Sequence, residues 1–169
     1  MSILSSSSLI KSVQKVAKVD KFYHICQTIV RIIDMATSTK GLTAEQCADY
    51  FRGILAKEFP ECSIRENVSV AELVGNVDAT FRLYKTRPYQ AYKAEWGAPY
   101  TFVVAREGRV VAVIMLAEKW KQYNNVKYLI SKMYMKKLGI PYIPFYTEMK
   151  NDIGYVVERL AKHINLQKQ

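Results

Sequence analysis

Apolar residues recur at intervals of three and four in two stretches near the start of the chain. The stretch over residues 9–35 predicts an amphipathic helix, and the same spacing over residues 44–59 predicts a second one. Thr43 and Gln46 have the spacing of a capping box, and Pro60 cannot continue a helix, so these residues set the expected bounds of the second helix. The chain is therefore expected to open with two helices separated by a short loop.

Shorter apolar runs in the middle of the chain indicate strands. Residues 62–70 alternate between apolar and polar side chains, which is typical of a half-exposed strand. Residues 100–105 and 110–116 are β-branched and aromatic runs joined by Arg-Glu-Gly-Arg, in which Gly108 suits a positive φ, so they predict a hairpin. The second run has no polar member and is therefore expected to be a central strand, buried on both faces.

The last third of the chain predicts a helix, a strand and a final helix. Residues 118–138 are expected to form one helix that ends at Gly139. Its apolar stripe contains Trp120, Tyr123, Val126, Ile130, Met133 and Tyr134. Residues 140–146 predict an edge strand because they hold two prolines, and Asn151 or Asp152 is expected to cap a helix that runs to residue 164. A strand, a long helix and a strand imply a right-handed crossover, which makes the two strands parallel.

These elements together predict one α/β domain over residues 41–169. It has a small mixed sheet with a central hairpin and flanking helices, and an N-terminal helical extension over residues 1–40 precedes it. Residues 76–99 predict no defined element.

Composition narrows the class of protein. Half of the 169 residues are apolar and 24% are charged, which is typical of globular proteins and argues against a disordered chain. No apolar run reaches the roughly 18 residues of a membrane span, so no membrane partner is expected. The three cysteines and two histidines lack metal-site spacing, which favours a cytoplasmic protein without metal or cofactor.

Positive charge is concentrated in one third of the sequence. The formal net charge is +10, and residues 82–137 contribute +9 of it, with twelve basic residues against three acidic ones. Such a concentration attracts nucleic acid, acidic protein surfaces or other polyanions. A solubilising surface is the plainer alternative.

Two groups of residues within this region are candidates for nucleic-acid binding. The first interleaves cations, which can contact phosphates, with aromatic rings, which can stack on bases. It consists of Arg82, Lys85, Arg87, Tyr89, Tyr92, Lys93 and Trp96. The second is one expected face of the helix over residues 118–138. That face carries Lys121, Asn125, Tyr128, Lys132 and Lys136. Aromatics packed onto the domain and a solvated lysine face are the structural alternatives.

Four segments, together with the order of the predicted elements, carry a resemblance to a known family. They are residues 62–73 (CSIRENVSVAEL), 101–105 (TFVVA), 113–117 (VIMLA) and 136–145 (KKLGIPYIPF). On these segments the chain resembles the PD-(D/E)xK, or restriction-endonuclease-like, nucleases, in a branch akin to very-short-patch-repair endonucleases. The resemblance covers roughly residues 43–164 and implies the restriction-endonuclease-like core.

The residues that perform catalysis in the resembling nucleases are absent here. In that branch, acidic residues on the hairpin hold a divalent metal that activates water at the scissile phosphate. This sequence has Thr101 where the first carboxylate is expected, Met115 where the glutamate is expected, and Ala117 where the second Asp or the Lys is expected. Met and Ala offer no oxygen ligand, and one hydroxyl is a poor magnesium site. The resemblance therefore implies a scaffold with a degenerate catalytic motif.

We therefore expect a catalytically inactive nuclease-like protein that binds nucleic acid or another polyanion through its basic region. One alternative is a protein-interaction module that meets an acidic partner, or forms a homodimer through an apolar surface of the N-terminal helix. The other is an active nuclease whose metal site has moved to Glu95, Glu118 or Asp78.

Overall fold

The computed structural model describes residue 39 and residues 41–164. The chain divides into two units, residues 1–37 and 38–169, and the described residues belong to the second. The predicted helix over residues 9–35, the homodimer contact expected of it and the extension over residues 1–40 lie outside the described residues, apart from residue 39.

A four-stranded mixed sheet forms the centre of the second unit. Its strands, in spatial order, are β1 (Ser63–Val68), β4 (Tyr100–Arg106), β5 (Arg109–Leu116) and β6 (Tyr142–Phe145). β4 is antiparallel to both β1 and β5, whereas β5 and β6 are parallel. The predicted mixed sheet, its central hairpin and the parallel strand after the crossover are confirmed.

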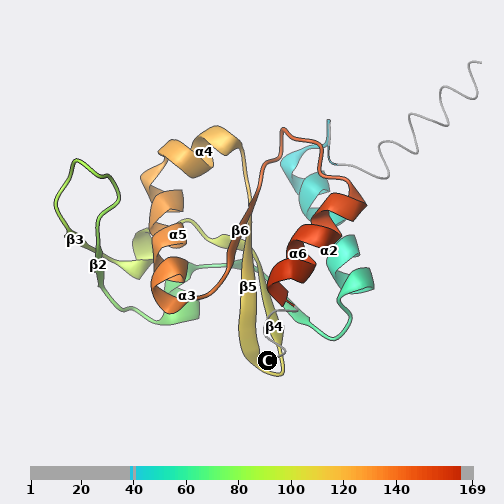
Figure 1. Cartoon of the computed structure of the whole chain (residues 1–169), viewed down its shortest axis with the longest axis horizontal. Coiled ribbons are helices and arrows are strands. Elements are labelled where there is room, and N and C mark those ends of the chain that lie inside the picture. The colour runs from blue at the N-terminus through green and yellow to red at the C-terminus, as the bar shows by residue number, and fades with distance from the viewer. Residues whose placement is uncertain (1–38, 40, 165–169) are drawn as a thin grey trace, which may run out of the picture. The chain divides into compact units, whose positions relative to one another are not determined.

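Helices cover both faces of this sheet (Figure 1). One face packs against α2 (Ala44–Glu58) and α6 (Ile153–Ile164), and the other against α3 (Val70–Val74) and α5 (Val126–Leu138). Within the described ranges, no helix has both the length and the apolar character needed to cross a membrane.

The two faces of β5 belong to two different cores. Ala112 and Ile114 lie in the core under α2 and α6, whereas Val113 and Met115 lie in the core under α3 and α5. All four side chains are buried, because successive residues of a strand point to opposite faces. The prediction that the fully apolar run is the central strand is confirmed.

A two-residue turn joins β4 to β5, and the register of the two strands shifts by one residue between Val104 and Ala105. Glu107 and Gly108 have φ values of 52° and 76°, and left-handed conformations at both central positions are the mark of a type I′ hairpin turn. The sequence predicted the positive φ of Gly108 only. Glu107 adopts it as well because the strands on either side fix the geometry of the turn.

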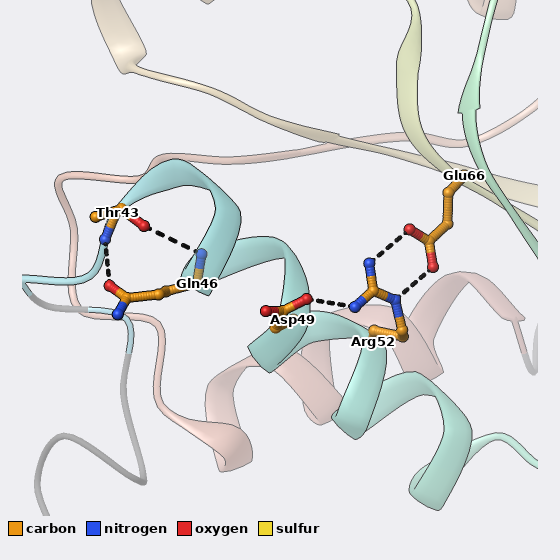
Figure 2. Close-up of polar contacts among 5 residues, drawn as sticks. All are labelled: Thr43, Gln46, Asp49, Arg52 and Glu66. Carbon is orange, nitrogen blue, oxygen red and sulfur yellow. Dashed lines mark hydrogen bonds and ion pairs between the residues drawn. The ribbon is translucent and has the colours of Figure 1, made fainter.

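The helix α2 begins as predicted, and one arginine ties it to the sheet (Figure 2). Thr43 Oγ1 accepts a hydrogen bond from Gln46 N at 3.2 Å, and Gln46 Oε1 accepts one from Thr43 N at 2.9 Å, which completes the capping box. Arg52 donates two hydrogen bonds to the Glu66 carboxylate of β1, at 2.6 and 2.7 Å, and a third to Asp49. These hydrogen bonds raise the pKa of Arg52 and lower the pKa of Glu66.

The prediction of one continuous helix over residues 118–138 is wrong. The structure has two helices, α4 (Lys119–Asn124) and α5, separated by Asn125 in an extended conformation. The Asn125 side chain accepts a hydrogen bond from Lys127 N at 3.0 Å, so it caps α5 instead of continuing α4.

Residues 76–99 contain regular structure that the sequence did not predict. β2 (Ala79–Phe81) and β3 (Gln90–Tyr92) form an antiparallel pair, followed by a single 3₁₀ turn at Ala94–Trp96. The Tyr134 hydroxyl of α5 lies within hydrogen-bond distance of the carbonyl oxygens of Val77 and Tyr92, at 2.7 and 2.6 Å. We call residues 79–92 the basic arm, and Figure 1 shows it at the opposite side of the second unit from α2 and α6.

Candidate nucleic-acid interface

The end of the hairpin opposite its turn holds the three positions at which the resemblance implies catalytic groups. Thr101 Oγ1 accepts a hydrogen bond from Leu116 N at 2.9 Å, so this hydroxyl links β4 to the end of β5. Met115 is fully buried in the core under α5, and Ala117, directly after β5, is buried as well. The three side chains therefore serve packing and strand pairing.

A buried glutamine occupies the same end of the sheet. Gln122 Nε2 lies within hydrogen-bond distance of the carbonyl oxygens of Met115, Ala117 and Phe145, at 3.3, 3.0 and 2.8 Å. Buried polar groups cost free energy unless they are hydrogen-bonded, so Gln122 satisfies these carbonyls and fixes α4 on the carboxyl ends of β5 and β6. Backbone oxygens at two of the three expected ligand positions are thus already engaged.

The acidic residues considered for a relocated metal site do not all meet. Asp78 and Glu95 line one polar cavity of about 350 Å³, together with Asn76 and Lys93. Glu118 instead precedes α4, where its carboxylate accepts a hydrogen bond from Lys121 Nζ at 2.8 Å. In the part of the chain that the structure describes, no three acidic, cysteine or histidine side chains gather in a way that could hold a metal ion.

The basic arm carries cations that are free of carboxylates. Its connecting loop presents Arg82, Lys85 and Arg87, all exposed. None of the three forms an ion pair with a carboxylate of the described residues. The sequence has no acidic residue between Asp78 and Glu95, so the whole arm is positively charged.

The aromatic residues of the first candidate group differ in their accessibility. Tyr89, directly before β3, is 67% exposed, with the guanidinium of Arg82 5.5 Å from its ring centroid. Tyr92 is half-buried and stacks on Phe81, with 4.7 Å between the ring centroids, so it holds the arm together. Trp96 is 47% exposed, and Lys93 Nζ lies 6.0 Å from its ring and 3.8 Å from Glu95.

The second candidate group is split by the break at Asn125. Lys121 lies on α4 and is paired with Glu118, whereas Lys132 and Lys136 lie on α5 and form no ion pair with a described carboxylate. The predicted single face over residues 121–136 is therefore wrong, because the extended Asn125 interrupts the helical period. Lys132 and Lys136 are four residues apart and still share one face of α5.

Sequence reasoning missed two features of this region. Trp120 and Tyr123 were expected on the buried stripe of one long helix, but they are exposed on α4. Gln122 gave no signal of its burial, whereas the pair Asn124 and Asn125 was a readable sign that the helix ends, because asparagine favours helix caps.

Comparison with known proteins finds no match: no family model, curated protein or solved structure is similar to this chain. The main parts of the candidate interface are the cations of the basic arm and Lys132 and Lys136 of α5, none of which pairs with a described carboxylate, and the exposed aromatics of α4.

Proposed function

We propose that this protein binds nucleic acid through its basic region and does not cleave it. The observation that carries the proposal is the basic arm, where Arg82, Lys85 and Arg87 lie exposed without a carboxylate partner among the described residues. Cations whose charge is not neutralised within the protein are available to phosphates, and phosphate contacts supply most of the sequence-independent affinity for nucleic acid.

The sheet order supports a nuclease-like scaffold. Two antiparallel pairings, a helical crossover and a parallel fourth strand are the arrangement expected of the restriction-endonuclease-like core. We propose this relationship on the resemblance of the sequence and on this order together.

Loss of catalysis is proposed from the chemistry at the end of the hairpin. Thr101, Met115 and Ala117 supply one hydroxyl between them, and that hydroxyl already accepts a hydrogen bond from Leu116 N. Metal-assisted phosphodiester hydrolysis needs several oxygen ligands in place.

The binding proposal is tested by titrating fluorescent DNA and RNA over a series of salt concentrations. In the double variant Lys85→Ala/Arg87→Ala, the slope of log K against log salt should flatten by up to about 1.8 for duplex DNA and about 1.4 for single strands. The matched control is Lys57→Ala/Lys162→Ala, which removes the same charge from α2 and α6 and should leave the slope unchanged. Failure of the wild-type chain to bind either polymer at about 50 mM salt would reject the proposal and favour the protein-interaction alternative.

Cleavage is tested separately with plasmid, single-stranded DNA and RNA in the presence of magnesium or manganese. We expect no turnover. Turnover that disappears in Asp78→Asn or Glu95→Gln would contradict the proposal and assign the cavity between these residues as a relocated metal site.

A further inference from the structure

Two large aromatic side chains stand out on the surface of α4. Trp120 is 68% exposed and Tyr123 is 55% exposed. They are three residues apart and so lie on the same side of the helix. We call these two residues the α4 shelf.

The exposure of the α4 shelf is imposed by the fold. The only buried residue of α4 is Gln122, whose amide is bonded to the ends of β5 and β6, so the helix cannot roll its aromatic side inward without breaking those bonds. Asn124 Nδ2 also donates to the Trp120 carbonyl at 3.1 Å, at the point where Asn125 ends the helix.

Cations lie near Tyr123 of the shelf. Lys132 Nζ lies 6.0 Å from the ring centroid of Tyr123. The pKa of the Tyr123 hydroxyl is lowered, first by the hydrogen bond that it accepts from Tyr146 at 3.2 Å and then by the charges of Lys132, Lys119 and Arg159.

The carboxylates near the shelf are already occupied. Glu118 is bound by Lys121, and Glu148 accepts a hydrogen bond from Lys119 N at 2.8 Å. Lys119 and Lys132 form no ion pair with a described carboxylate, so an approaching anion would meet these two cations beside exposed aromatic rings.

We propose that the α4 shelf stacks unpaired bases of a single-stranded nucleic acid while Lys119 and Lys132 contact its phosphates. The chemistry fits this partner because each nucleotide offers both an aromatic face and an anion, and an aromatic ring flanked by lysines meets both. Bases inside a duplex are stacked on one another and cannot lie on Trp120. The inference rests on the proposed function and adds the substrate class.

The test uses the intrinsic fluorescence of Trp120. The chain has two tryptophans, so Trp96→Phe leaves Trp120 as the single reporter. The probes are an oligodeoxythymidine and an oligouridine of about 12 nucleotides, an abasic oligonucleotide of the same length, and a blunt DNA duplex. We expect the first two to quench Trp120 and the abasic strand and duplex to leave it unchanged. Equal quenching by the abasic strand would overturn the inference, because that strand has phosphates but no bases.

Affinity measurements separate this inference from the proposed function. Trp120→Ala should weaken oligodeoxythymidine binding at least about fivefold, which corresponds to about 1 kcal/mol for one stacked base, and should leave duplex binding unchanged. Trp120→Phe should recover most of the loss, and circular dichroism checks that both variants are folded. If Trp120→Ala leaves single-strand binding intact, or weakens both polymers equally, the inference fails while arm-dependent binding stands. If wild-type protein binds no polymer, both fail.

Discussion

The two ends of the second unit differ in whether their charged side chains form ion pairs. On the side of α2 and α6, Arg52 is held by Asp49 and Glu66, and Lys162 is paired with Glu158 at 2.7 Å. On the side of the basic arm, the loop between β2 and β3 presents three cations that no described carboxylate neutralises. Paired charges hold elements in place, whereas unpaired charges leave an electrostatic field that a ligand can use. Variants at the two ends should therefore separate stability from binding.

The largest effect is expected from the core under α2. Phe51 is fully buried, and its ring centroid lies 4.8 Å from that of Phe145. Phe51→Ala should lower the free energy of unfolding by about 3–5 kcal/mol, because it removes apolar contacts and leaves a cavity. Urea denaturation measures the loss. If the folded variant also binds nucleic acid more weakly, packing under α2 and binding at the basic arm are coupled. Stability and binding are then not separated between the two ends.

A smaller effect is expected from Gln122→Leu, at the junction between the sheet and α4. The change leaves the carbonyls of Met115, Ala117 and Phe145 without their side-chain donor and should cost about 1–3 kcal/mol. Gln90→Leu is the control, because Gln90 is exposed on β3. A cost no larger than that of the control would show that Gln122 does not anchor α4.

Tyr134→Phe should act on the basic arm alone. Its hydroxyl lies within hydrogen-bond distance of the carbonyls of Val77 and Tyr92, and the hydrogen bond that it donates contributes about 1 kcal/mol. We expect faster amide hydrogen exchange over residues 77–92 and unchanged exchange in α2. Tyr89→Phe, at an exposed hydroxyl, is the control. Equal acceleration throughout the unit would show that the arm does not move independently.

The smallest effect concerns the ion pair between α2 and β1. Hydrogen bonds from Arg52 lower the pKa of Glu66 from its ordinary value of 4.5, so the pair stabilises the fold above that pH and loses its contribution as the pH falls through the lowered value. In Glu66→Gln, the loss of stability as the pH falls from about 5 to about 3 should be smaller than in the wild type. Thermal unfolding over this pH range measures it. Glu45→Gln, at an exposed carboxylate of α2, is the control.

The sequence predicted those elements whose pattern of apolar residues extends over enough positions to show a period or a continuous run. The run from Val110 to Leu116 is apolar at every position, and Gly108 marks the turn before it, so the hairpin follows directly. The strands of the basic arm have three residues each, which is too short to show a period. A hydrogen bond to Tyr92 of β3 comes from Tyr134, more than forty residues further along the chain.

The sequence predicted the charge of the candidate site but not the contacts and exposure of its side chains. The +9 over residues 82–137 identified the basic region. The net charge does not show which cations are paired, as Lys121 is with Glu118 three residues before it. Trp120 was expected on the buried side of one long helix, because the helical period was continued across Asn125. Asn125 instead caps the following helix.

The outermost strands of the sheet bear on how this protein resists aggregation. β1 carries Asn67 at a φ of 51°, and its pairing with β4 skips that residue. β6, at the other border, contains Pro144, which has no N–H to donate. An open border with a regular row of donors and acceptors invites strands from other molecules, and a kink or a proline interrupts that row. Both borders are therefore poor templates for intermolecular β-pairing, because the row of donors and acceptors is interrupted at each edge of the sheet.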